Sequence, residues 1–184
     1  KMNREDALKL VKQHVKTKNL VKHMLATEAV MASLARRLGE DEEEWALAGL
    51  LHDIDYDKTS DDPDRHSLVG GELLEELGVD EDIVHAVKAH NECHGLPRES
   101  LLDKALWAVD PLTGLLVAAA LIHPEKKLNA IDVGFVMNRF KESSFARGAN
   151  RDQMKSCSEL GLALEEFIDI GLVAMQGISS ELGL

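Results

Sequence analysis

Histidine and aspartate side chains interrupt apolar stretches at several points between residues 23 and 110. The clearest case is the adjacent pair His52-Asp53, which closes the apolar run "WALAGLL". A buried carboxylate is costly unless it is paired or binds a metal, and imidazole combined with carboxylate suits a divalent transition metal. The sequence therefore predicts a metal site, and the candidate ligands are His23, His52, Asp53, His66, His90 and Asp110.

Helical spacing directs two of these candidates toward the core. His52 shares a helix face with Trp45, and Asp110 shares one with Leu106. Pro111 directly follows Asp110 and removes a backbone donor, so we expect it to kink the helix at this point. The pattern thus predicts that the polar side chains are held by the same helices that build the core.

Almost every other segment also reads as helix, because apolar residues recur with helical spacing and no sustained period-two alternation occurs. The expected helices cover residues 4–15, 20–38, 42–53, 67–77, 80–90, 101–122, 129–140 and 163–176. Asn19 is expected to cap the second of them, and residues 56–65 and 143–153 are expected to be loops. We predict one all-α domain, with a helical core over residues 2–127 and a small helical extension over residues 128–184 packed on it.

Charge and composition narrow the range of partners. The chain has 184 residues, with 21 basic against 33 acidic side chains and a net charge of -12. This balance disfavours a nucleic-acid polymer, whose phosphates would be repelled. A small phosphorylated substrate remains compatible, since a bound cation reverses the sign locally. Aromatic residues make up only 4% of the chain, so the core is expected to be aliphatic.

The cysteines and the apolar runs bear on the cellular compartment. Cys93 and Cys157 are too few for a disulfide framework, which is typical of a reducing compartment. The longest apolar run, residues 115–122, is too short to cross a bilayer, and no secretory signal is visible at the start. We expect a cytoplasmic protein without a membrane partner, and the sequence indicates no oligomeric state.

The order of the candidate ligands resembles the HD-domain superfamily of metal-dependent phosphohydrolases. The superfamily pattern H…HD…D matches His23, His52-Asp53 and Asp110, while His66 and His90 match two further histidines of its two-metal members. The stretch "HDID" is similar to the HDIG variant, although an aspartate stands where that variant has glycine. "AHNECHG" and "AVDPLTGLLVAAALI" also resemble stand-alone HDIG-type hydrolases, and the resemblance covers about residues 20–127.

This resemblance implies a helical bundle with metal ions at its centre. By analogy, His23, His52, Asp53 and Asp110 hold a first ion, and Asp53 bridges to a second ion held by His66 and His90. The implied cofactor is a divalent transition metal, two per chain, with Fe, Mn, Ni, Co and Zn all compatible. The implied activity is hydrolysis of a phosphate ester of a small nucleotide-like substrate by a metal-bound hydroxide.

Other polar residues near the motifs are candidates for the reaction or for substrate binding. Asp57 is a candidate general acid beside Asp53, although Tyr56 holds the place where some superfamily members have an acid. Lys58 is a candidate catalytic and phosphate-binding residue, or else a solvated loop lysine. Further candidates for substrate contacts are His94, which could instead support its neighbours, and the possible phosphate clamps Arg147 and Arg151.

Two other functions remain open from the sequence. A di-iron oxygenase of the HD type uses the same six ligands, so the ligand set alone does not fix the reaction. A non-catalytic module that binds a metal or a nucleotide is the third reading, although an intact ligand set is less typical of it.

Overall fold

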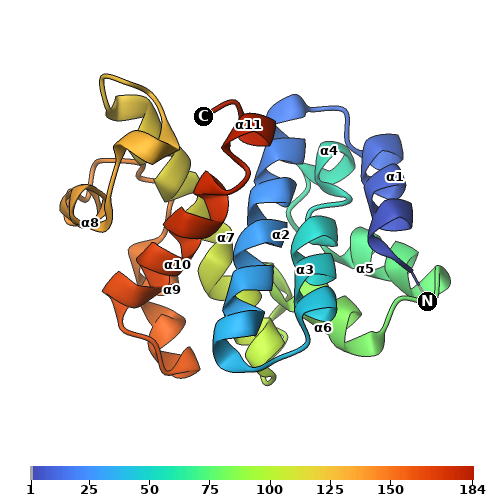
Figure 1. The fold of residues 1–184 in the computed structure, drawn as a ribbon. Helices are drawn as coiled ribbons and strands as arrows, with labels where there is room; N and C mark the ends of the chain where they lie inside the picture. The colour runs from blue at the N-terminus through green and yellow to red at the C-terminus, as the bar shows by residue number, and fades with distance from the viewer. Residues whose placement is uncertain (1) are drawn as a thin grey trace.

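The computed structural model describes residues 2–184 and contains helices and no strand in that range, which confirms the all-α class. Three short 3-10 helices lie among the α-helices. Figure 1 shows how the α-helices are arranged. In chain order the elements are α1 (Arg4–His14), α2 (Lys18–Leu38), α3 (Glu42–Leu51), α4 (Tyr56–Thr59), α5 (Leu68–Glu76), α6 (Glu81–Ala89), η1 (Glu92–His94), α7 (Leu101–Ile122), η2 (Leu128–Ala130), α8 (Val133–Phe140), α9 (Arg151–Lys155), η3 (Ser156–Leu160), α10 (Leu164–Gln176) and α11 (Ser179–Leu182).

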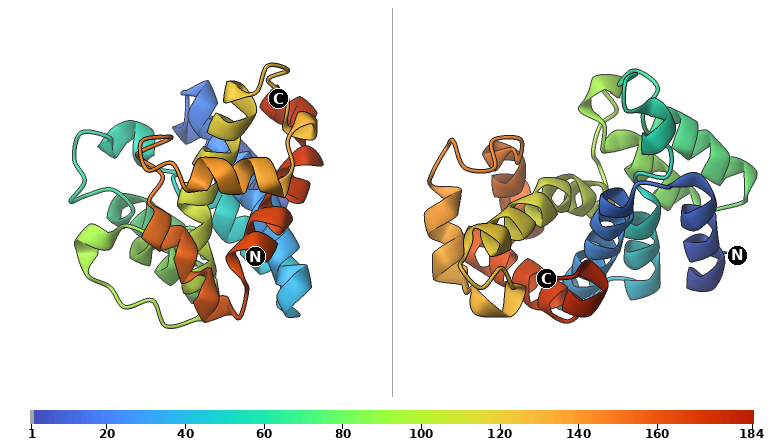
Figure 2. Two further views of the ribbon diagram at one scale, coloured as in Figure 1. Left: turned by 90° about the vertical axis from the view of Figure 1, so that its left-hand side faces the viewer. Right: turned by 90° about the horizontal axis from the view of Figure 1, so that it is seen from above.

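Helices α2 and α7 form the middle of the molecule. Seen from above, α1 and α3 to α6 lie on one side of them and α8 to α11 lie on the other (Figure 2). Helix α2 contacts α3, α7, α10 and α11, while α7 also contacts α6, α8 and α9. The C-terminal helices therefore share one core with the N-terminal helices.

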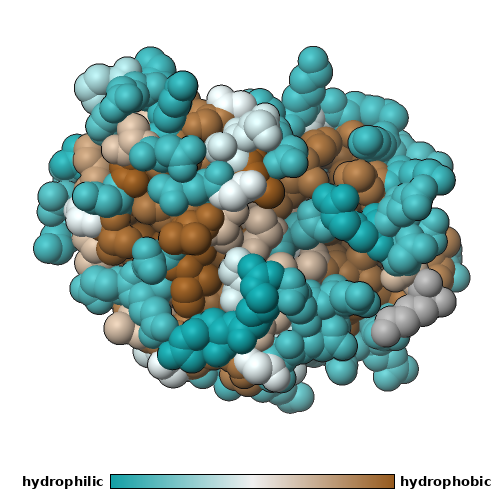
Figure 3. All heavy atoms as spheres, in the orientation of Figure 1, coloured by the Kyte–Doolittle hydropathy of each residue, from teal (hydrophilic) through white to brown (hydrophobic). Residues whose placement is uncertain are grey.

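The core is aliphatic, as the composition predicted. Within residues 2–184, the largest fully buried side chains are leucine, isoleucine and methionine apart from Phe167, and Trp45 and Phe140 are the other buried aromatic residues. Figure 3 shows hydrophilic side chains around the rim of one face and apolar side chains gathered over α10. The exposed Val173 belongs to this helix.

Helix α7 continues through Pro111 to Ile122 instead of ending at the proline. Proline leaves the carbonyl four residues earlier without its usual backbone donor. In this helix the carbonyl belongs to Trp107, and the side-chain amide of Gln153 donates to it at 2.8 Å. A side chain of α9 thus replaces the missing hydrogen bond.

The length of α7 also changes one expectation from the sequence. Among residues 2–184, α7 is the one helix that is long and apolar enough, by length and composition, to cross a membrane. The run at residues 115–122, on which the expectation from the sequence rested, is only the last part of this helix. More than half of the apolar window of α7 is buried inside the protein, as in the core helix of a globular fold.

Some local expectations are wrong. Helix α2 begins at Lys18, with Thr17 as its N-cap, so Asn19 lies inside the helix and does not cap it. The expected loops contain helical turns, because Tyr56–Thr59 and Arg151–Lys155 form α4 and α9. Both turns are too short for hydrophobic periodicity to reveal.

Helices α2 and α3 approach each other closely at Gly49. A Cβ atom at this position would lie 2.8 Å from the carbonyl oxygen of Thr27 and 2.9 Å from the amide nitrogen of Glu28. Both atoms belong to the backbone of α2, so they cannot move aside as a side chain can. Glycine is therefore required for this helix pair.

We expect Gly49→Ala to lower the free energy of unfolding by about 1–3 kcal/mol or more, because the added methyl overpacks a backbone contact. Chemical denaturation measures this change. Gly114→Ala in α7 is the matched control, since a Cβ there meets nothing within 4 Å. Alanine should raise the stability at that position by about 0.5–1 kcal/mol. Equal effects of the two substitutions would contradict the packing argument.

Candidate metal centre

The fold brings all six candidate ligands to one place. His23 comes from α2 and Asp110 from α7, while His52 and His90 are the C-cap residues of α3 and α6. The remaining two, Asp53 and His66, lie directly after His52 and directly before the N-cap of α5. Residues far apart in the chain thus form two groups with metal-ligand character.

The first cluster consists of His23, His52, Asp53 and Asp110. The Nε2 atom of His23 lies 3.0 Å from Nε2 of His52 and 2.9 Å from Oδ1 of Asp110. The Oδ2 atom of Asp53 lies 3.3 Å from Nε2 of His23 and 3.2 Å from Nε2 of His52. Two nitrogens and two oxygens therefore point at a common centre.

The second cluster consists of Asp53, His66 and His90. Here Asp53 uses its other oxygen, Oδ1, which lies 3.3 Å from Nε2 of His66 and 3.1 Å from Nε2 of His90. One carboxylate therefore faces both clusters, with one oxygen turned to each.

Two of the histidines have their rings fixed by the ends of their own helices. The Nδ1–H of His52 donates to the carbonyl of Gly49 at 2.7 Å, and the Nδ1–H of His90 donates to the carbonyl of Val87. Each bond runs to the residue three positions earlier, at a helix end where carbonyls lack backbone donors. Because a carbonyl only accepts, Nε2 of each neutral ring carries a lone pair toward its cluster.

The other two histidines are oriented by side chains. Thr113 donates its hydroxyl to the carbonyl of Asp110, so its oxygen is free to accept from Nδ1 of His23 at 2.9 Å. The Nδ1–H of His66 donates to Oδ1 of Asp55 at 2.7 Å. All four imidazoles therefore present Nε2 to the clusters and use Nδ1 for support, which is the usual arrangement of metal-ligating histidine.

These clusters fit divalent metal ions. When the imidazoles are neutral, each cluster holds only lone pairs at its centre, and such atoms repel one another unless a metal ion or a proton lies between them. For metal–ligand distances of about 2.1 Å, neighbouring ligands at right angles are about 3.0 Å apart. The separations of 2.9–3.3 Å between nitrogen and oxygen atoms in the clusters agree with this value.

The members of the centre differ in their exposure to solvent. The side chains of His23 and Asp110 are 24% and 28% exposed and that of His66 is 13% exposed, whereas those of His52 and His90 are 0% and 2% exposed. The most exposed edge of the centre is therefore formed by His23 and Asp110.

The carboxylates of the centre raise the pKa values of the histidines beside them. Burial alone lowers the pKa of His23, but hydrogen bonds with Asp110 and Asp53 outweigh it and raise the pKa to about 9. Burial likewise opposes the charge of His66, yet its bonds with Asp53 and Asp55 raise the pKa to about 9. The pKa of Asp110 lies well below its usual range, because its hydrogen bonds with the histidines outweigh burial.

Metal-free protein should lose stability between pH 6.5 and about 9, while metal binding should tighten over the same range. The raised pKa values of His23 and His66 mean that their charged forms stabilise the fold fully below 6.5, and this stabilisation is lost through about 9. A metal ion binds neutral imidazole and displaces these protons. Melting temperatures of metal-free and metal-loaded protein should therefore diverge as the pH rises, and a constant difference would contradict this assignment.

The structure gives Asp57 a different role from general acid. Its Oδ2 accepts hydrogen bonds from the backbone amides of Lys16 and Thr17, and its Oδ1 accepts from the Thr17 hydroxyl. These bonds lower the pKa of Asp57, the Thr17 hydroxyl bond most, whereas a general acid needs a raised value. Asp57 fixes the link between α1 and α2. Lys58, the other catalytic candidate in this turn, lies 3.0 Å from Nδ1 of His14 in α1.

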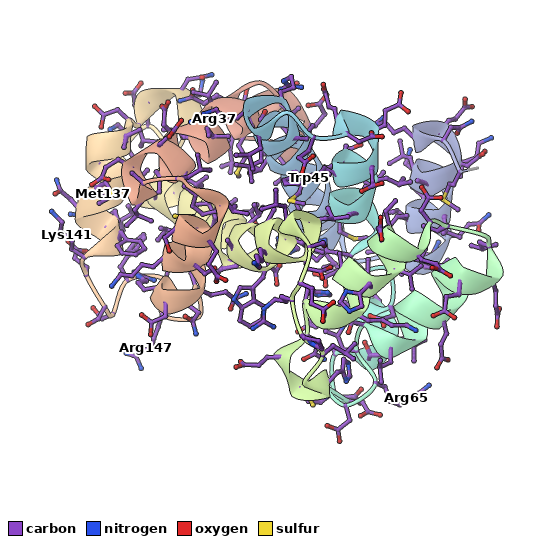
Figure 4. The ribbon with its side chains drawn as sticks, turned by 90° about the horizontal axis from the view of Figure 1, so that it is seen from below. Arg37, Trp45, Arg65, Met137, Lys141 and Arg147 are labelled. Carbon is purple, nitrogen blue, oxygen red and sulfur yellow. The ribbon has the colours of Figure 1, made fainter. Side chains whose placement is uncertain are left out.

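Arg151 is also a structural residue and not a phosphate clamp. Its guanidinium donates to six backbone carbonyls, those of Arg139, Phe140, Glu142, Phe145, Ala146 and Ala149. These bonds fix the loop before α9. Arg147 lies in this loop, is exposed, and has no hydrogen-bond or ion-pair partner among residues 2–184. Figure 4 shows Arg147 at the outer end of the loop.

For His94 the structure favours the supporting role. Its Nε2 donates to the backbone carbonyl of His66 at 2.6 Å, and Asn91 donates to the same carbonyl at 3.0 Å. The two side chains hold the backbone that carries a residue of the second cluster. A direct substrate contact of His94 finds no support in these contacts.

Reasoning from the sequence missed the role of Asp55. This carboxylate is buried, accepts from the amides of Ser67 and Gly70 at 2.7 Å and 2.8 Å, and orients His66. Burial and these bonds also hold Ser67 at a φ of 71°, which is unusual for a non-glycine residue. The available signal was the aspartate in "HDID" itself, a second carboxylate at the end of an apolar run.

The fold and the site together define the class of the protein. It is an all-α bundle whose helices hold two clusters of metal-donor atoms, and the clusters share one carboxylate. The profile of the HD domain family matches residues 20–132. The chain therefore belongs to the HD-domain superfamily of metal-dependent phosphohydrolases, as its motifs indicated.

Curated relatives agree with this family. Ribonuclease Y of Oleidesulfovibrio alaskensis is 34% identical over 98 residues, which cover 53% of this chain and 18% of the relative. The symmetrical bis(5'-nucleosyl)-tetraphosphatase of Halalkalibacterium halodurans is 32% identical, over 59% of this chain and 68% of the relative. The chain thus spans about a fifth of the ribonuclease Y relatives and two thirds of the tetraphosphatase. No solved structure matches the chain.

Proposed function

We propose that this protein hydrolyses a phosphate ester or anhydride of a small nucleotide-like substrate with two divalent transition-metal ions. The observation that carries the proposal is the carboxylate of Asp53, which turns one oxygen to each cluster. Such a bridge suits two cations held close together. Metal ions in this arrangement generate hydroxide near neutral pH and neutralise charge on phosphate oxygens.

The residues of the chain have separate tasks in this proposal. Four histidines with Nδ1 engaged elsewhere keep their Nε2 lone pairs fixed, so little reorganisation is needed during the reaction. The burial of His52 and His90 excludes water from the closed side of the centre. Arg147, whose side chain has no hydrogen-bond or ion-pair partner among residues 2–184, is the candidate for binding two phosphate oxygens bidentately.

The names of the relatives support a nucleotide-like substrate but describe substrates of different sizes. The name of the tetraphosphatase describes a dinucleotide, and the name of ribonuclease Y describes RNA. We favour the small substrate, because a net charge of -12 repels a polymer of phosphates. Cleavage of RNA with a preference over dinucleotides would reverse this choice.

The test is a substrate panel with protein loaded separately with Fe²⁺, Mn²⁺, Co²⁺, Ni²⁺ and Zn²⁺. The panel includes p-nitrophenyl phosphate, its bis ester, nucleoside monophosphates, a dinucleoside tetraphosphate and a short RNA. We expect turnover of at least one phosphate compound, abolished by a chelator and independent of oxygen. Metal-loaded protein that hydrolyses none of them would contradict the proposal.

The same measurements separate the di-iron oxygenase. That activity requires iron and consumes oxygen, so anaerobic turnover with Mn²⁺ would exclude it as the main reaction. Tight nucleotide binding without any turnover would instead favour the non-catalytic module.

A further inference from the structure

We propose that Ser67 and Asn91 form a reciprocal brace, which sets the spacing of His66 and His90 for the second metal ion. Each of these two residues directly follows one of the histidines in the chain. Each also donates a hydrogen bond to the backbone of the segment that carries the other histidine. This inference deepens the proposed function, because it concerns how the same centre holds its second ion, and it rests on that function.

The first half of the brace runs from Ser67 to the end of α6. The Ser67 hydroxyl donates to the carbonyl of Lys88 at 3.1 Å. Lys88 lies in the last turn of α6, where carbonyls lack a backbone donor within the helix. The preceding carbonyl, that of Val87, accepts a hydrogen bond from His90. The side chains of Ser67 and His90 therefore hold the same helix end.

The second half of the brace runs from Asn91 back to the segment before α5. The side-chain amide of Asn91 donates to the carbonyl of His66 at 3.0 Å and to that of Pro63 at 2.8 Å. These bonds use both hydrogens of the amide group. Its oxygen accepts from the backbone amide of Cys93 at 3.1 Å, which fixes the orientation of the side chain. Asn91 therefore ties the segment that carries His66 to the end of α6.

The backbone at Ser67 would suit glycine better than serine. Its φ of 71° lies in the left-handed region, which glycine adopts without steric cost. A serine at a helix N-cap usually accepts from an amide of the first turn, but here Asp55 accepts from the amides of Ser67 and Gly70. The Ser67 hydroxyl is therefore free to donate to Lys88, and this bond accounts for a side chain at an unfavourable backbone angle.

The brace concerns the second cluster and not the first. His66 and His90 both direct Nε2 at the same oxygen of Asp53, and their ring centroids are 5.1 Å apart. His66 lies outside the helices, so no regular element fixes its position. In the first cluster, His23 lies within α2 and His52 caps the end of α3. Loss of the brace should therefore weaken binding of the second ion and spare the first.

Calorimetric titration of metal-free protein with Co²⁺ tests the brace. The variants are Ser67→Ala, Ser67→Gly and Asn91→Asp, the last of which keeps the acceptor of the side chain and loses the donor. In each variant the dissociation constant of the second ion should rise about tenfold or more, while that of the first ion stays within about threefold of wild type. The charge added by Asn91→Asp would by itself tighten cation binding, so weaker binding reports the lost hydrogen bond. The step that belongs to the second ion is identified by its absence in His66→Ala.

Two matched variants make the same changes elsewhere. Ser156→Ala removes a hydroxyl that donates to the carbonyl of Gln153 at 2.6 Å, and Asn150→Asp changes the N-cap residue of α9. Both variants should bind the two ions as tightly as wild type does. Ser67→Gly keeps the test valid if Ser67→Ala folds poorly, because glycine tolerates the backbone angle.

The outcomes separate this inference from the proposed function. An unchanged second dissociation constant in the Ser67 and Asn91 variants, or an equal loss of both ions, would overturn the brace and leave the two-ion hydrolase standing. A selective loss of the second ion, in a protein whose wild type turns over no phosphate compound, would support the brace and reject hydrolysis. A wild type that binds only one ion would overturn both.

Discussion

Replacement of Asp53 by alanine is expected to remove both metal ions and to abolish measurable hydrolysis. Asp53 is the only residue that belongs to both clusters, and its oxygens lie 3.1–3.3 Å from histidine nitrogens on either side. Turnover should fall by about 10³-fold or more, since cations at a phosphate are worth several kcal/mol and about 1.4 kcal/mol is tenfold. Elemental analysis and phosphate release measure the two effects.

Single substitutions in each cluster sharpen this experiment. His66→Ala belongs to the second cluster alone, so it should lower the metal content from two ions toward one. Asp132→Ala, at the N-cap of α8, is the control for loss of a carboxylate and should keep both ions. Full metal content or full activity in Asp53→Ala would disprove the shared-carboxylate centre.

The second large effect is expected at Asp55, through replacement by asparagine. The asparagine oxygen can still accept from the amides of Ser67 and Gly70, so the local backbone is preserved. Its amide group, however, donates toward Nδ1 of His66 and reverses the tautomer of that ring. Nε2 then carries a proton and no longer offers a lone pair. The affinity for the second ion should fall by about 10–100-fold, while the first ion stays bound.

Asp57→Asn is the matched control, because it makes the same change two residues further along at a site that contacts only the α1–α2 link. Both ions should remain, and the nitrogen chemical shifts of His66 should change only in Asp55→Asn. If Asp55→Asn lowers the melting temperature of metal-free protein and loses both ions together, Asp55 acts on the fold and not on His66.

The sequence predicted the parts of the fold that depend on local pattern. Helical periodicity located the long helices, and a polar residue on an apolar helix face identified His52 and Asp110. These signals are strong because burial of a charged group needs a partner. Four of the six candidate ligands also lie at or next to a helix end, and Asp110 directly precedes Pro111 in α7. At such positions the backbone places a side chain reproducibly.

The errors arose from contacts between distant segments. Asp57 followed the HD pair closely enough to be considered an acid, but its partners lie about forty residues earlier. Arg151 was considered a phosphate clamp, whereas the carbonyls that surround it belong to the end of α8 and to the irregular loop after it. Neither partner can be read from periodicity, because both depend on how the chain folds back.

The close contact at Gly49 makes stability and metal retention hard to separate by evolution or engineering. The same residue touches the backbone of α2 and accepts the hydrogen bond from His52, while α2 carries His23. Any mutation that loosens the α2–α3 pair therefore changes the spacing between two candidate ligands. Selection for a heat-resistant variant would enrich for metal retention, and variants that lose their ions would include many substitutions far from the ligands.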